Sequence, residues 1–360
     1  MDNQLTQSQF LSLINSLSDG VIVTDEHQKV IHYNAAALSL LNSNTSLENQ
    51  SIDKVAVLRD KNNKQVLLSK VIDDKKASYE NRDLRIEYDD DSYIAVSVTV
   101  RSIYKAYKTK DSGIVAIIRD ISKEKSLEEE RDEFISVVSH ELRTPITIAE
   151  GNISNAQLMI SKGSSKNEII SALDKAHDQI LFLSELINDL ATLSRAERGK
   201  LGLSTTTINV NALIRSIHTF YKQDALEKGI HFLNKIDPHL EALQSSELYV
   251  KEILQNLVTN AIKYTDNGSV TIGVRSKPDG IQFYVQDTGI GIKQAELKKI
   301  FDKFYRSEDY HTKEHRGTGL GLYITSKLCK LIDAKITVES QIGKGSNFIL
   351  YVPNLQLHKK

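Results

Sequence analysis

The sequence predicts a multidomain chain: an α+β domain, then an all-α helical hairpin, then an α/β domain. Three observations predict this order. Short β-like runs dominate residues 10–121, and two apolar stripes at helical spacing follow in residues 122–200. Strand-like and helical runs then alternate through residues 201–354. A chain of 360 residues is long enough for each part to bury a core of its own.

Composition excludes several classes of protein. The formal net charge of -1 gives no reason to expect nucleic acid as a partner. Cys329 is the one cysteine, so no intrachain disulfide and no thiol-rich metal site can form. No apolar run reaches the ~20 residues of a membrane helix, and "MDNQLTQSQF" lacks the features of a signal peptide. We therefore expect a cytoplasmic chain without a membrane segment.

The first part combines β-like runs with one helical run. The β-like runs are "GVIVTDE", "KVIHYN", "YIAVSVTV" and "GIVAIIRD", and the helical run is "AAALSLL". Asn34 directly precedes the helical run, and its side chain is suited to cap that helix. These features predict a compact α+β module.

The second part begins with "SKEKSLEEERDE", a charged run rich in good helix formers. Two apolar stripes with alternating spacings of three and four residues follow it, joined by the polar loop "SKGSSKN". The stripes consist of Leu142, Ile146, Ala149, Ile153, Ala156 and Ile160, and of Ile169, Leu173, Ala176, Ile180, Leu183, Ile187 and Leu190. Because one hairpin buries such stripes poorly, we expect a homodimer in which two hairpins form a four-helix bundle.

A group of reactive side chains lies on the first of these helices. His140 projects roughly opposite the stripe, so we expect it to face solvent, with Glu141 beside it and Thr144 one turn further along. Pro145 leaves the carbonyl of Glu141 without its helical donor, which predicts a poorly packed break where the helix bends. The histidine is either an ordinary surface residue or a nucleophilic imidazole with Glu141 as its base or orienter.

The run "NLVTNAIKYT" places Asn256, Asn260 and Lys263 on one face of a predicted helix. Amide oxygens can ligate Mg²⁺, and a lysine offers a point charge to phosphate. Tyr264, which follows, is placed to lie against a base. An ordinary amphipathic helix with polar outer residues explains the same pattern.

The run "QDTGIGI" follows a predicted strand and contains Asp287, Gly289 and Gly291. A carboxylate accepts hydrogen bonds and therefore suits the amino group of adenine, while glycines let the backbone approach a ring closely. A plain turn after the strand is the alternative explanation.

A further glycine run, "RGTGLGL", contains Gly317, Gly319 and Gly321 and opens a predicted helix. Backbone N–H groups at such a helix N-terminus bind phosphate, although a tight loop also explains the glycines. Before it, "FDKFYR" contains Arg306, which we count among the candidate cofactor-binding residues, and the charged loop at residues 307–315 is expected to form a lid.

The run "SHELRTP" resembles the phosphoacceptor box of bacterial sensor histidine kinases. This resemblance implies that His140 is the phosphorylated residue and that Glu141 is its general base. It also implies that Thr144 positions water when the enzyme dephosphorylates its partner.

The later runs, closing with "GKGSNF", resemble in order and distance the ATP-binding domain of the same family, which has a Bergerat-type α/β sandwich fold. The resemblance implies that Asn256 ligates Mg²⁺, that Asn260 and Lys263 meet the phosphates, and that Asp287 recognises adenine. Ser346 stands where the family often has threonine, which preserves the hydroxyl.

The run from "SLSDGVIVTDE" to "AAALSLL" and the closing "IIRDISKEKSLEEE" resemble a PAS sensory domain that continues into a signalling helix. A reactive cysteine for a flavin photosensor is absent, since no cysteine precedes residue 329. His27 and His32 fall near a predicted turn or strand, where solvent exposure is expected rather than haem ligation. The module has an unknown ligand or none, and a constitutive dimerisation role is equally open.

Together these resemblances imply a dimeric ATP-dependent protein histidine kinase that requires Mg²⁺. It would autophosphorylate His140, pass the phosphoryl group to an aspartate of a response-regulator receiver domain, and also dephosphorylate that regulator. Two alternatives stand beside this function. An ATP-driven conformational ATPase of the same fold would not need the pair of His140 and Glu141, and a non-catalytic signalling scaffold would be expected to have lost asparagines or glycines from the site.

Overall fold

The computed structural model describes residues 9, 12–72, 78–88, 90, 92–103, 113–197, 204–307 and 317–354. The chain folds into two compact units, residues 1–138 and residues 139–360. Among the described segments, no helix has both the length and the apolar character needed to cross a bilayer.

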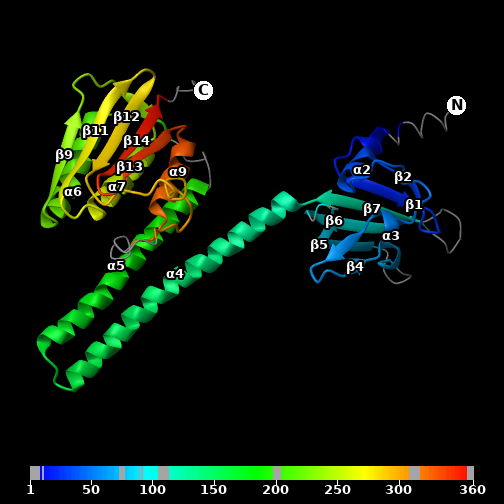
Figure 1. The fold of residues 1–360 in the computed structure, drawn as a ribbon, viewed down its shortest axis with the longest axis horizontal. Helices are drawn as coiled ribbons and strands as arrows, with labels where there is room; N and C mark the ends of the chain where they lie inside the picture. The colour runs from blue at the N-terminus through cyan, green and yellow to red at the C-terminus, as the bar shows by residue number, and fades with distance from the viewer. Residues whose placement is uncertain are drawn as a thin grey trace. The chain divides into compact units, whose positions relative to one another are not determined.

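The first unit is an antiparallel sheet whose described strands follow the order β2-β1-β7-β6-β5-β3-β4 (Figure 1). The strands are β1 (Gly20–Thr24), β2 (Val30–Tyr33), β3 (Leu58–Asp60), β4 (Gln65–Val66), β5 (Ser78–Glu87), β6 (Tyr93–Ser102) and β7 (Ile114–Asp120). The helices are α2 (Ala35–Leu40), α3 (Ile52–Val55) and the 3₁₀ helix η1 (Leu68–Lys70). The four predicted β-like runs correspond to β1, β2, β6 and β7, so the predicted α+β module is confirmed.

Strand β1 is buried on both faces. Ile22 belongs to the main core, whereas Val21 and Val23, which point to the other face, pack with Ile14 from a helical turn at residues 12–15. This two-sided burial explains why the sequence of β1 is a continuous apolar run rather than an alternating one.

Asn34 caps α2 as predicted. Its Oδ1 accepts the N–H of Ala37 at 2.9 Å, and the same oxygen accepts the N–H of Val21, also at 2.9 Å. The Nδ2 group donates to the carbonyls of Ile14 and Asp19 at 3.0 and 2.8 Å. One buried amide therefore ties the helix, strand β1 and the preceding segment together.

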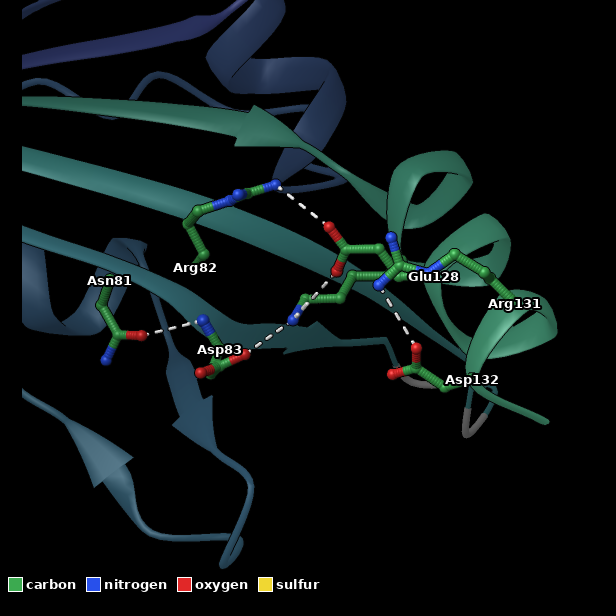
Figure 2. Close-up of polar contacts among 7 residues, drawn as sticks. Asn81, Arg82, Asp83, Glu128, Arg131 and Asp132 are labelled. Carbon is green, nitrogen blue, oxygen red and sulfur yellow. Dashed lines mark hydrogen bonds and ion pairs between the residues drawn. The ribbon is translucent and has the colours of Figure 1, made fainter. Parts of the chain in front are cut away.

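Helix α4 (Ser122–Ser161) leaves the sheet after β7, and ion pairs join its first turns to a bulge at residues 81–84 of β5. Lys125 Nζ lies 2.7 Å from Asp83 Oδ1 and 3.8 Å from Glu128 Oε2, while Arg82 reaches Glu128 at 3.7 Å (Figure 2). These side chains are 29% to 65% exposed, so each pair stabilises the junction only modestly.

Helix α5 (Lys166–Glu197) turns back from α4 through a short loop at residues 162–165, which confirms the predicted helical hairpin. Ser165 and Glu168 form a capping box at the start of α5. The Glu168 carboxylate accepts the N–H of Ser165 at 3.0 Å, and Ser165 Oγ accepts the N–H of Glu168 at 3.4 Å. This reciprocal cap fixes where α5 begins.

The predicted stripes contain two contrasting sets of residues. Small residues such as Ala149, Ala156 and Ala176 are buried within the hairpin of one chain. The other set recurs every seventh residue and is 40% to 62% exposed. Its members are Ile146, Ile153 and Ile160 of α4 and Leu173, Ile180 and Ile187 of α5. The single hairpin thus leaves an apolar seam at coiled-coil spacing, here called the outer seam.

The expectation of a poorly packed break at Pro145 is wrong. Helix α4 is continuous from Ser122 to Ser161, and Pro145 is one of its buried residues. Burial of the ring compensates for the hydrogen bond that a proline cannot make, so the helix passes through this position.

The rest of the second unit is an α/β domain. Its main sheet has the order β13-β14-β12-β11-β9, with β9 and β11 parallel and the other neighbours antiparallel. The strands are β9 (Ile230–Ile236), β11 (Gly268–Lys277), β12 (Gly280–Asp287), β13 (Lys335–Gln341) and β14 (Gly345–Pro353). The helices are α6 (Val210–Glu227), α7 (Glu247–Lys263) and α9 (Gly321–Leu331), and β8 (Thr206–Ile208) pairs with β10 (Leu243–Ser245).

The core of this domain lies between the sheet and its helices. Alternate residues of β12, including Phe283 and Val285, are fully buried, and α7 packs on β11 and β12. Cys329 of α9 is also buried, and burial raises the pKa of its thiol to about 12. This thiol is therefore protonated at neutral pH.

Candidate functional site

A cleft of about 240 Å³ lies in the second unit, bounded by α7, the loop after β12, the segment before α9, and α5. Ten of the predicted cofactor-binding residues line it. They are Asn256, Asn260, Lys263, Tyr264, Asp287, Gly291, Arg306, Gly317, Gly319 and Gly321. Gly289 does not line the cleft directly, although its N–H group contacts the cleft residue Asp287.

Asp287 ends strand β12 and is 6% exposed. Its Oδ1 accepts the N–H groups of Gly289 at 2.8 Å and Ser346 at 3.2 Å. Burial raises the pKa of the Asp287 carboxyl, and the two N–H groups act in the opposite direction. Because both bonds use Oδ1, the second oxygen remains to accept a hydrogen bond from a molecule in the cleft.

Helix α7 presents a polar face to the cleft, as its residue spacing predicts. The Nδ2 of Asn256 donates to the carbonyl of Gly321 at 2.9 Å, which orients the amide and leaves its oxygen as an acceptor. Lys263 Nζ lies 5.2 Å from the ring centroid of Tyr264, and burial lowers the pKa of the Lys263 ammonium. An amide oxygen and a partly desolvated cation thus face the same cavity.

Glycine is required where the two loops approach other backbone. Gly291 has φ +72°, and an added Cβ would lie 2.1 Å from the carbonyl oxygen of Gln341. At Gly319, with φ +70°, a Cβ would lie 2.8 Å from the carbonyl carbon of Phe304. A side chain at either position would clash with backbone that cannot move easily. The predicted lid, apart from Ser307, lies outside the described residues.

Two carboxylates of α5 also line the cleft, and sequence analysis did not find them. Asp189 Oδ2 accepts the hydroxyl of Thr318 at 2.5 Å, and Glu185 lies one turn earlier on the same helix. Burial raises the pKa of Asp189 to about 6. Acidic residues on an exposed helix are common, so the sequence carries no signal that distinguishes this pair.

The reactive cluster on α4 has the expected exposure. The side chain of His140 is 73% exposed, and its Nδ1 lies 3.6 Å from Oε1 of Glu141. Thr144 Oγ1 donates to the carbonyl of His140 at 3.3 Å. Because Nδ1 faces the carboxylate, the exposed Nε2 is the ring nitrogen available to an incoming group.

Three family models match the chain in succession. Residues 18–123 match a PAS domain, residues 130–199 match the His Kinase A (phospho-acceptor) domain, and residues 245–356 match the "Histidine kinase-, DNA gyrase B-, and HSP90-like ATPase" family. The chain therefore has the domain order of a sensor histidine kinase. The α+β module, the helical hairpin and the α/β domain correspond to the PAS, phosphoacceptor and ATPase-type models, respectively.

The chain is similar to Sensor protein SrrB of Staphylococcus aureus. In strains N315 and NCTC 8325 / PS 47, the relative is 29% identical over 347 residues, which cover 95% of this chain and 55% of the relative. The chain thus spans about half the length of the curated relatives it matches.

A crystal structure of histidine kinase ThkA in complex with response regulator protein TrrA has the same fold. It is 21% identical, with a TM-score of 0.51, and the match covers 96% of this chain and 98% of that one.

Proposed function

We propose that this chain is a sensor histidine kinase, which uses ATP to phosphorylate His140 and then transfers the phosphoryl group to an aspartate of a response-regulator receiver domain. The observation that carries the proposal is the exposed imidazole of His140, whose Nδ1 faces Glu141 while Nε2 is open to solvent. A nucleophile needs this access, and a neighbouring carboxylate orients the ring and stabilises its proton.

The described residues fit ATP with Mg²⁺. The second oxygen of Asp287 would accept the amino group of adenine, and the oriented amide oxygen of Asn256 would ligate Mg²⁺. Asn260, Lys263 and the backbone at residues 317–321 would hold the phosphates. Bound Mg²⁺ would neutralise part of the negative charge of the phosphates.

The chemical step follows from the orientation of the imidazole. Nε2 of His140 attacks the γ-phosphorus of ATP, forming an N–P bond while the bond to the leaving ADP oxygen breaks. Glu141 stabilises or accepts the proton on Nδ1, which becomes acidic as the ring donates its electron pair. Catalysis otherwise consists of positioning and charge stabilisation.

The proposal includes the organisation of the chain. Residues 10–121 form the sensory domain, residues 122–200 the signalling helix and phosphoacceptor hairpin, and residues 201–354 the ATP-binding domain. The outer seam would close against a second copy, which gives a homodimer. Thr144, on the face of His140, would orient water for dephosphorylation of the regulator.

Neither alternative function is favoured. A conformational ATPase has no use for the exposed pair of His140 and Glu141. A scaffold without catalysis has no use for the arrangement around Asp287.

The test uses labelled ATP with the purified chain and with His140→Gln. The wild type should gain acid-labile, base-stable phosphate, whereas His140→Gln should gain none and still bind ATP, because the histidine does not line the cleft. His177, another exposed histidine of the hairpin, provides the control: His177→Gln should be labelled normally. Label retained on His140→Gln would contradict the assignment.

A further inference from the structure

The contact between α5 and the ATP-binding domain lies inside the cleft rather than beside it. Thr318 belongs to the glycine-rich segment that precedes α9, is 6% exposed, and donates its hydroxyl to Asp189. Glu185 and Asp189 are one helical turn apart, so both carboxylates face the same way. The cleft therefore contains two negative charges that α5 supplies, rather than the ATP-binding domain itself.

These carboxylates lie beside the groups that suit phosphate. Glu185 and Asp189 both favour the charged form of Lys263. The Lys263 ammonium is close to the backbone at Gly317, since an added Cβ there would lie 2.1 Å from Nζ. The anions of α5 thus lie near the Lys263 ammonium, the Thr318 hydroxyl and the start of α9. These are groups that also suit a phosphate.

The position along the hairpin relates this contact to the phosphoacceptor. His140 is 21 residues before the end of α4, and Asp189 is 23 residues after the beginning of α5. At 1.5 Å per residue, both lie roughly 30–35 Å from the connecting loop. The carboxylates therefore hold the ATP-binding domain at the level of His140 along the hairpin.

We propose that Glu185 and Asp189 occupy, as internal anions, the part of the cleft that receives the nucleotide's phosphates, so that a nucleoside triphosphate displaces α5 when it binds. The inference rests on the proposed function, because it assumes that the cleft binds ATP. The triphosphate and the carboxylates carry like charge and need the same partners, Lys263 and Thr318. Binding of the substrate thereby frees the ATP-binding domain to move relative to His140.

The test compares ligands that differ in their number of phosphates. Adenosine, ADP and ATP are titrated with Mg²⁺ into the full chain by calorimetry, with Asp189→Asn and Glu185→Gln as variants. Asparagine retains an oxygen that can accept the Thr318 hydroxyl, so this variant removes the charge and keeps the hydrogen bond. Asp174→Asn, at an exposed position of α5, is the matched control.

Asp189→Asn should bind ATP between about threefold and about tenfold more weakly than the wild type, because a neutral side chain docks in the cleft without the cost of burying a charge. The loss should be smaller for ADP and absent for adenosine. Glu185→Gln should show the same order, and Asp174→Asn should match the wild type. Hydrogen exchange of residues 185–193 should become faster when ATP is added and stay unchanged with adenosine.

Three results separate the two proposals. ATP affinity that is unchanged or tighter in both charge variants, with a wild type that binds ATP, overturns the displacement and leaves the kinase function intact. If ATP does not alter the hydrogen exchange of residues 185–193, the displacement is likewise overturned and the kinase function is unaffected. A folded wild type that binds neither ADP nor ATP overturns the proposed function together with this inference.

Discussion

Thr144 donates its hydroxyl to the carbonyl of His140, one turn back along α4 and 3.3 Å away. Helical threonines commonly make this bond, and it suffices to explain the residue structurally. The hydroxyl oxygen nevertheless keeps acceptor capacity on the exposed face that carries the imidazole. A role in orienting water during regulator dephosphorylation is therefore compatible with the observed hydrogen bond.

Thr144→Ala separates the two roles. If Thr144 orients water, autophosphorylation should persist while dephosphorylation of the regulator slows by about tenfold or more, equivalent to at least about 1.4 kcal/mol. If the residue only shapes the helix, both rates should change together. Thr147, which makes the same bond to the carbonyl of Arg143, provides the control variant Thr147→Ala.

Asp287→Asn should weaken ATP binding while the domain stays folded. The substitution places an amide where a carboxylate accepts two N–H groups, so an N–H₂ group faces either those donors or the adenine amino group. The mismatch should cost about 1–3 kcal/mol of binding free energy, measured by calorimetry. Asp279→Asn, at an exposed turn with positive φ that asparagine tolerates, should bind ATP normally. Equal affinity of Asp287→Asn and the wild type would remove Asp287 from adenine recognition.

How far the sequence predicts this molecule depends on how local each feature is. Strand β1 is predictable because burial on both faces makes it a continuous apolar run. Strand β5 is not, because a bulge interrupts its alternation and several of its residues are exposed and polar. The groups around Asp287 are predictable from a short sequence motif. The contact of Asp189 with Thr318, in contrast, joins residues 129 apart in sequence. Such a contact depends on how α5 packs, which no local pattern encodes.

The outer seam predicts a matched pair of variants. Ile187 lies on the seam and is 57% exposed in one chain, whereas Leu181 lies off the seam and is 55% exposed. Ile187→Glu would bury an unpaired charge in a four-helix bundle, at a severe energetic cost, and light scattering should show a monomer or aggregate. Leu181→Glu should remain dimeric. Identical masses for the two variants would mean that the seam is not the dimer interface.

The pKa of Asp189 predicts a pH dependence of ATP affinity. The carboxyl has a pKa of about 6 in the cleft, against 3.8 for an ordinary aspartate, so the docked form of α5 binds the proton more tightly. Docking is therefore favoured as the pH falls through 6 towards 3.8, and it weakens as the pH rises. Thr318, Glu185, Glu252 and Lys263 contribute to this value, with burial as the main cause.

Since α5 and the phosphates compete in our proposal, ATP should bind more tightly at pH 7 than at pH 5. A single group changes the affinity by at most about tenfold per pH unit. Asp189→Asn should lose this component and retain the titration of ATP itself, which is common to both proteins. Parallel pH profiles of the two proteins, measured by calorimetry, would contradict the competition.

The burial of Cys329 has a practical consequence for measuring how two protomers associate. Maleimide reagents attack thiolates, and a thiol with a pKa of about 12 inside α9 provides almost none at neutral pH. Because the chain has no other cysteine, a cysteine introduced at exposed Lys162 would be the one site that accepts a dye. Each protomer would then carry a single fluorophore at the tip of its hairpin, and energy transfer could follow the association of two protomers without replacement of Cys329.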